Sequence, residues 1–127
     1  MSDLFDITGK TAILTGASKG MGFQMAQGLA KQGAKVVISS RTQADLDAAA
    51  DAINEACGAK RAYGVAANAG YKDQLEKLVS KSRELAGKAT IVVGNAGVNP
   101  YYGVTSEISD KAYEKTMQVN VQSNLWL

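Results

Sequence analysis

The chain contains no histidine and only one cysteine among its 127 residues. The absence of histidine excludes a Ser-His-Asp triad, a histidine general base and nearly every metal site that uses histidine. We therefore expect no metal site, and any proton transfer must use other groups. The single cysteine, Cys57, cannot form an intramolecular disulfide. Its place on the apolar stripe of an expected helix predicts a small buried side chain in preference to a reactive thiol.

Long hydrophobic runs and a strong excess of charge are also missing. No apolar run reaches 18 residues, and residues 1–6 carry acids where a secretory signal would carry positive charge. The net charge is +2, with lysines and arginines scattered among acids, so neither nucleic acid nor a membrane surface is expected as a partner. The length and the 46% apolar content suit one domain with a buried core. We expect a soluble cytoplasmic protein.

Short apolar runs alternate with helical patterns along the chain. Apolar or β-branched runs predict four strands, at residues 11–14, 35–39, 61–67 and 90–93. Apolar residues at helical spacing predict helices at about 21–32, between Thr42 and Gly58, from about Leu75 to Gly87, and from about Ser109 or Asp110 to the end. Strands that alternate with helices predict one α/β domain over residues 1–127, with a parallel sheet and right-handed crossovers.

Three glycines follow the first predicted strand and open the first helix, at Gly16, Gly20 and Gly22. A strand, a tight turn and a helix start in this order present free backbone N–H groups and the positive end of a helix dipole to a phosphate. Gly16 would turn the chain off the strand, Gly20 would let a pyrophosphate approach the backbone, and Gly22 would let helix and strand pack closely. The turn is predicted to hold a nucleotide diphosphate, although plain turns with three glycines also exist.

The second predicted strand ends at Ser39-Ser40-Arg41, where a fold that binds NAD normally carries an acid for the ribose hydroxyls. No carboxylate stands there to repel a 2′-phosphate. Arg41 is expected to stack on adenine and to bind that phosphate, with Lys19 on the same side of the site. The alternative is that both cations are solvated surface charges. Two cations without an acid favour NADP(H) over NAD(H).

The pattern TGxxxGxG in residues 15–22 and the sequence Gly94-Asn95-Ala96-Gly97 resemble the short-chain dehydrogenase/reductase family. The resemblance implies a Rossmann-type doubly wound parallel sheet and an oxidoreductase that interconverts a small-molecule carbonyl and alcohol by hydride transfer. It also implies a homo-oligomeric parent protein. Gly94 departs from the family pattern, which has asparagine there, so one side-chain hydrogen bond is lost while the loop keeps its shape. Residues 99–103 look like the carbonyl-reductase-like branch, where Tyr101 and Tyr102 would line a substrate mouth or merely cap the sheet edge.

The resemblance also implies which residues bind the cofactor. Asn68 and Ala69 would lie beside the adenine ring, although Asn68 suits an ordinary turn equally. Asn95, Ala96 and Gly97 would line the floor under the inner ribose and nicotinamide. The expected cofactor-binding set is Gly16, Ser18, Lys19, Gly20, Met21, Gly22, Ser40, Arg41, Asn68, Ala69, Asn95, Ala96 and Gly97.

Asn120 is the one expected catalytic residue. Its helical face also carries Tyr113, Met117, Val121 and Asn124, and we expect this face to be buried. A buried amide without a partner costs about 1–3 kcal/mol, so Asn120 needs a specific partner. The sequence Val-Asn-Val at 119–121 matches the family's active-site asparagine, and a satisfied core asparagine is the alternative.

The other catalytic residues of the family, a serine and a YxxxK motif, do not occur at matching positions. None of the five tyrosines is followed four residues later by lysine. The last predicted helix reaches Leu127 without a capping residue, and the fourth strand would be an unprotected sheet edge. We therefore expect a sheet truncated after the fourth strand and the following helix, without detectable activity alone.

A second interpretation is a non-catalytic nucleotide-binding or interaction module. A Rossmann-like methyltransferase is a variant of it, but that enzyme would require an acid after the second strand.

Overall fold

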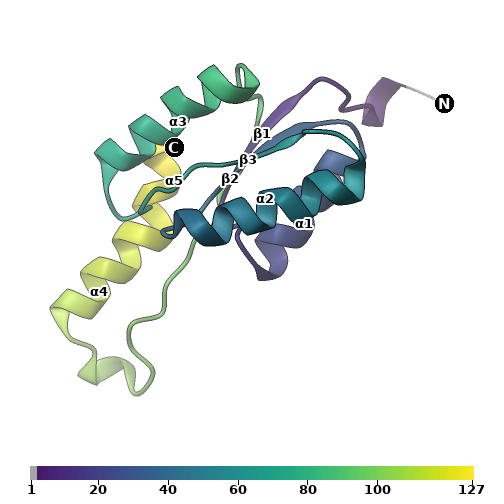
Figure 1. The fold of residues 1–127 in the computed structure, drawn as a ribbon. Helices are drawn as coiled ribbons and strands as arrows, with labels where there is room; N and C mark the ends of the chain where they lie inside the picture. The colour runs from purple at the N-terminus through teal and green to yellow at the C-terminus, as the bar shows by residue number, and fades with distance from the viewer. Residues whose placement is uncertain (1–2) are drawn as a thin grey trace.

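Four parallel strands form one sheet in the computed structural model, which describes residues 3–127 (Figure 1). The strands are β1 (Thr11–Thr15), β2 (Lys35–Ser39), β3 (Ala62–Gly64) and β4 (Ile91–Val93), in the spatial order β3-β2-β1-β4. Because β1 pairs with both β2 and β4, the winding direction changes at β1. This arrangement confirms the Rossmann-type doubly wound sheet. In such sheets, ligands bind outside the carboxyl ends of the strands, at the place where the winding changes.

Helices cover both faces of this sheet because successive strand residues point to opposite sides. Leu14 and Ile38 pack with the helices α1 and α2 on one face, whereas Ile13 and Val37 pack with α3 on the other. Figure 1 shows the two helical layers on either side of the strands. The helical elements are η1 (Asp3–Phe5), α1 (Gly20–Lys31), α2 (Gln43–Cys57), α3 (Lys72–Ala86), η2 (Thr105–Glu107), α4 (Asp110–Met117), η3 (Gln118–Gln122) and α5 (Ser123–Trp126).

β3 is shorter than the predicted strand at 61–67. Its ladder with β2 ends at the pair Ile38 and Gly64. The chain still follows β2 beyond this point, because the Val65 N–H donates to the Ile38 carbonyl at 3.0 Å and the Ala67 N–H donates to the Ser40 carbonyl at 2.9 Å. The alternate groups are taken by Gln43 of α2, whose Nε2 donates to the Gly64 carbonyl at 2.9 Å and whose Oε1 accepts from the Ala66 N–H at 2.9 Å.

The last helical segment differs from the expected regular helix, because η3 is a π-helical turn between α4 and α5. Val119 and Ser123 are buried, whereas Tyr113 and Val121 are 55% and 52% exposed. Ala112 and Thr116 are half-buried on the same side as Val119, so a different face of the helix packs inward from the start of α4. The predicted buried face through Tyr113 and Val121 is therefore wrong.

One other side chain is less buried than expected. Cys57 is half-buried at the end of α2, where it packs against the α1 and α2 cluster. Throughout residues 3–127, every helix falls short of the length and apolarity needed to cross a membrane.

The turn after β1 and the loop after β4 are joined by hydrogen bonds. Thr15 Oγ1 accepts from the backbone N–H groups of Asn95 at 3.1 Å and Ala96 at 3.0 Å. In return, Asn95 Nδ2 donates to the Gly16 carbonyl at 2.9 Å. Gly16 has a φ of +62°, and a Cβ there would lie 3.0 Å from Ala96 Cα, so a larger residue would be strained and would collide. These contacts fix the turn against the sheet.

Gly22→Ala is expected to destabilise the fold, because a Cβ there would lie 2.5 Å from the Gly16 carbonyl oxygen and 2.7 Å from Asn95 Nδ2. Overpacking of this kind lowers the free energy of unfolding by about 1–3 kcal/mol, which urea denaturation measures. Gly28→Ala is the matched control in α1, since a Cβ there meets nothing within 4 Å. It should raise the stability by about 0.5–1 kcal/mol. Equal stabilities of the two variants would contradict the close packing at Gly22.

Thr15→Val is expected to lower the free energy of unfolding by about 1–3 kcal/mol, because the Ala96 N–H loses its acceptor. Thr15→Ser keeps the oxygen and should lose markedly less. Thermal unfolding followed by circular dichroism compares the two variants. If serine and valine destabilise the protein to the same extent, the hydroxyl is not what joins the turn to the loop.

Candidate functional site

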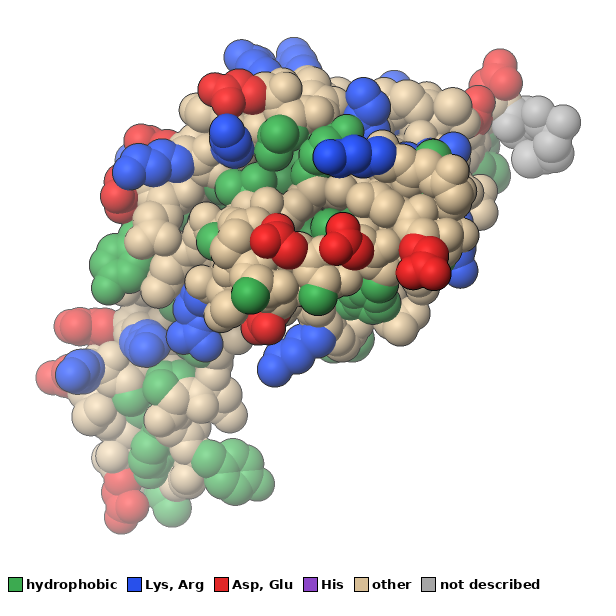
Figure 2. Space-filling model, viewed as in Figure 1, with side chains coloured by type: hydrophobic (Ala, Val, Ile, Leu, Met, Phe, Trp, Pro, Cys, Tyr) green, Lys and Arg blue, Asp and Glu red, His purple; other side chains and the backbone are tan. Residues whose placement is uncertain are grey.

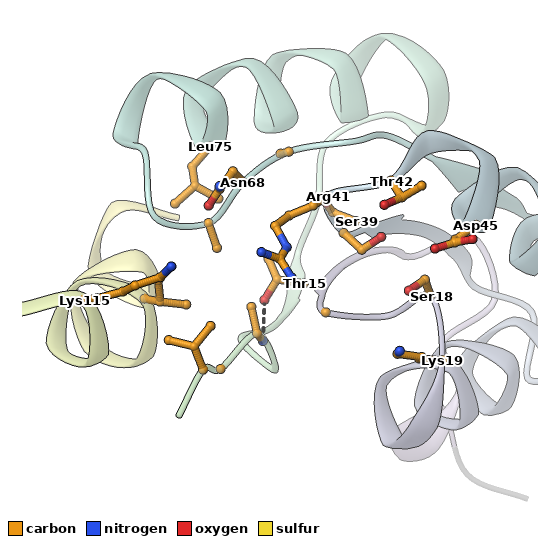
Figure 3. Close-up of a pocket in the computed structure, with 18 residues that line it drawn as sticks. Thr15, Ser18, Lys19, Ser39, Arg41, Thr42, Asp45, Asn68, Leu75 and Lys115 are labelled. Atoms are coloured by element: carbon orange, nitrogen blue, oxygen red, sulfur yellow. Dashed lines mark hydrogen bonds between the residues drawn. The ribbon is translucent and has the colours of Figure 1, made fainter. Parts of the chain in front are cut away.

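A cavity of about 310 Å³ opens at the carboxyl ends of the strands (Figure 3). It lies between the turn after β1, the loops after β2, β3 and β4, and the segment from α4 to η3. Most residues predicted to bind the cofactor line it: Gly16, Ser18, Lys19, Ser40, Arg41, Asn68, Ala69, Ala96 and Gly97. The structure therefore brings together segments that are far apart in the sequence.

Four residues of the predicted set do not line this cavity: Gly20, Met21, Gly22 and Asn95. Gly20 and Met21 lie at the start of α1, where the Met21 side chain is 78% exposed. Gly22 is buried against the turn, and Asn95 Nδ2 donates a hydrogen bond to the Gly16 carbonyl of the turn. The positions of Gly22 and Asn95 suit a role in shaping the turn more than contact with a ligand.

The first turn of α1 presents backbone N–H groups beside the cavity. Lys19 is the N-cap residue, and its side chain makes no capping hydrogen bond. The first N–H groups of a helix have no partners within the helix. A Cβ at Gly20 would meet nothing within 4 Å, so the approach to the turn is open. Open amides at a helix N-terminus suit a phosphate group.

Two cationic side chains line the cavity near this turn. Figure 3 shows Arg41 extending from the loop after β2 into the cavity, whereas Lys19 lies beside Ser18 at the start of α1. Both cations are exposed to solvent. The geometry makes them available to an anionic ligand.

Asp45 also lines the cavity, and it corrects the expectation that no carboxylate is available at this end of the site. Its side chain comes from the first turn of α2 and lies near Thr42 and Ser18 in Figure 3. The signal was present in the sequence. A helix that follows a parallel strand begins at the carboxyl edge of the sheet, so its first-turn side chains can reach the same cavity as the strand end.

The segment from α4 to η3 contributes two lining residues that the sequence interpretation missed, Lys115 and Val119. They stand four residues apart, a spacing that puts side chains on one helical face. Thr15, Ser39, Thr42, Ala67, Leu75 and Val98 complete the lining.

Asn68 lines the cavity and forms a turn. Its Oδ1 accepts from the Gly70 N–H at 2.9 Å, and its own N–H donates to Gln74 Oε1 at 2.7 Å. The carboxamide oxygen is thus occupied by the turn, which leaves the amide nitrogen as the group to offer a ligand.

The side chain of Asn120 has a specific hydrogen-bond partner, as expected for a buried amide. Its Oδ1 accepts from the Val98 N–H at 2.7 Å and its Nδ2 donates to the Val98 carbonyl at 2.9 Å. The side chain is half-buried and does not line the cavity. Asn120 therefore holds in place the loop whose residues Ala96, Gly97 and Val98 form part of the cavity wall.

Close packing explains why glycine, and not asparagine, stands at position 94. A Cβ at this position would collide with Asn124 Oδ1, so the side chain of Asn124 fills the volume that an asparagine at 94 would need. Asn124 Nδ2 donates to the Asn120 carbonyl at 3.1 Å.

The aromatic residues after this loop lie outside the cavity. Tyr101 donates its hydroxyl to the Val104 carbonyl at 2.8 Å, and Tyr102 is 96% exposed. Within residues 3–127, no group of three or more acidic or cysteine side chains could hold a metal ion.

Comparisons with known proteins agree with this geometry. Residues 10–127 match the family described as short chain dehydrogenase. "Dehydrogenase/reductase SDR family member 4" of Caenorhabditis elegans is 38% identical over 115 residues, which are 91% of this chain and 44% of that protein. The L-sorbose reductase of Gluconobacter frateurii, solved with NADPH and L-sorbose, superposes with a TM-score of 0.88 at 30% identity, over 97% of this chain and 47% of the other.

A third relative was solved with the other nicotinamide cofactor. The 3-ketoacyl-(acyl-carrier-protein) reductase of Brucella melitensis, complexed with NADH, superposes with a TM-score of 0.85 at 31% identity, over 94% of this chain and 48% of the other. The present chain spans less than half the length of these three relatives. The fold, the site and the match over residues 10–127 together place the chain in the short-chain dehydrogenase/reductase family of oxidoreductases.

Proposed function

We propose that this chain is the cofactor-binding half of an NADPH-dependent enzyme that interconverts a carbonyl and an alcohol. The observation that carries the proposal is the cavity at the carboxyl ends of the strands, where the uncapped start of α1 lies near Arg41 and Lys19. The bound nicotinamide would donate or accept the hydride.

The residues present fit a dinucleotide. The first backbone N–H groups of α1, at the end of the turn from Gly16 to Gly22, would bind the pyrophosphate, since they have no partners within the helix and the approach at Gly20 is open. Ser40 and Arg41 would bind the adenosine end, with Asn68 and Ala69 beside adenine. Asn95, Ala96 and Gly97 would lie under the inner ribose, where Asn95 donates to the Gly16 carbonyl.

Asn120 is proposed to contribute to catalysis in the complete enzyme. Its two hydrogen bonds to Val98 would hold the loop that lies under the reacting end of the cofactor. Because the chain contains no YxxxK motif, we expect no measurable turnover by these 127 residues alone.

The preference for NADP(H) rests on charge. A 2′-phosphate carries up to two negative charges. The guanidinium of Arg41 can bind a phosphate through two hydrogen bonds, and this interaction is stronger than the one it would make with a neutral ribose hydroxyl. One relative was solved with NADPH and another with NADH, so the relatives support a nicotinamide cofactor but do not favour one form. The proposed preference for NADPH therefore rests on Arg41 and Lys19.

The remaining parts of the proposal concern partners and location. We propose a small-molecule carbonyl or alcohol as substrate, a homo-oligomeric parent and a cytoplasmic location, with neither nucleic acid nor a membrane as partner. A non-catalytic nucleotide-binding or interaction module is the second candidate, favoured by the absence of YxxxK from the chain.

Titration of the chain with NADPH, NADH and S-adenosylmethionine tests the proposed cofactor. We expect NADPH to bind most tightly in isothermal titration calorimetry. Arg41→Asp should lower the ratio of NADPH to NADH affinity by about tenfold or more, because it replaces an attraction by a repulsion. Arg83→Asp is the matched control, since Arg83 is an exposed arginine of α3 outside the cavity. Preference for NADH or S-adenosylmethionine, or an unchanged ratio in Arg41→Asp, would contradict the assignment.

A further inference from the structure

Asp45 lines the same cavity as the two cations that are proposed to select the phosphorylated cofactor. Its neighbours in Figure 3 are Thr42 and Ser18, and Lys19 lies on the other side of Ser18. The adenosine end of the site thus contains charges of both signs.

Asp45 forms no ion pair with Lys19, Arg41 or Lys115, the cations that line the same cavity. Within residues 3–127, the one ion pair joins Lys81 to Glu84 at 3.5 Å, far along the chain in α3. Asp45, Arg41 and Lys19 therefore each face an incoming ligand as separate charges. An anion that approaches Arg41 is attracted by the cations and also repelled by Asp45.

The rest of α2 adds to this negative charge. The helix carries Asp45, Asp47, Asp51 and Glu55 and no lysine or arginine. Figure 2 shows acidic side chains in a row over α2. Asp45 itself stands in the first turn, where the helix dipole stabilises a carboxylate. The carboxylate is therefore held at the start of α2, beside the cavity.

We propose that Asp45 limits the preference of this site for the phosphorylated cofactor and so sets the ratio of NADPH to NADH affinity. This inference rests on the proposed nicotinamide cofactor. A carboxylate accepts hydrogen bonds from ribose hydroxyls, which NADH retains, and repels the 2′-phosphate, which NADPH carries. Asp45 therefore acts against Arg41, and the balance of the two side chains determines specificity.

Asp45→Asn tests the proposal, because it keeps the size of the side chain and removes its charge. For charges several ångström apart near a protein surface, loss of the repulsion should raise NADPH affinity about three- to tenfold. NADH affinity should stay the same or fall. Asp45→Lys should raise the ratio further, so the two variants form a graded series. Fluorescence titration of both nucleotides measures the ratio.

Asp51→Asn is the matched control, since it removes an equal charge from an exposed position of α2 outside the cavity. Its ratio should remain within about twofold of the unsubstituted chain. An unchanged ratio in both Asp45 variants, or an equal change in Asp51→Asn, would overturn this inference and leave the proposed cofactor standing. Failure of the unsubstituted chain to bind either nucleotide would overturn the proposed function and this inference with it.

Discussion

The close contact between the turn after β1 and the loop after β4 is the constraint on which the site depends. Thr15 Oγ1 accepts two backbone N–H groups of that loop, and Asn95 returns a hydrogen bond to the Gly16 carbonyl. The approach is possible because Gly22 has no side chain where the turn and Asn95 meet. The pairing of β1 with β4 brings these segments to the same edge, so sheet order and turn shape support one another. The amides at the start of α1 remain free for a ligand as a result.

The loop after β4 is held from a second side. Asn120, from the π turn, makes both of its side-chain hydrogen bonds to Val98, while Thr15 holds the other end of the loop. The loop after β4 and the turn after β1, which line the cavity, are therefore held by neutral hydrogen bonds and close packing. The proposed selectivity has a different basis. Arg41 and Asp45 are exposed charges that line the cavity, where the adenosine end of the cofactor is proposed to bind, and substitution there should have little effect on the fold.

Much of this architecture follows from local sequence. The β-branched runs, the three glycines and the Gly94–Gly97 sequence suffice to predict a parallel sheet with a phosphate-binding turn, because each depends on neighbours in the chain. The errors concern burial and reach in three dimensions. The last helix buries Val119 and Ser123, whereas Tyr113 and Val121 are exposed. The position of Asp45 does not follow from the residues at the end of β2, because it lies in the first turn of the next helix, which reaches the same cavity. The filling of Gly94's side-chain volume by Asn124 depends on a contact across 30 positions of the chain.

The central claim is that the turn after β1 binds the diphosphate of a nicotinamide cofactor. Backbone amide chemical shifts of the isotopically labelled chain, recorded during titration with NADPH, test it most directly. The account predicts that the largest shift changes fall on Gly16 to Gly22, with smaller changes at Arg41 and Ala69. Changes concentrated elsewhere, for example along α3, while the amides of the turn stay unmoved, would contradict it.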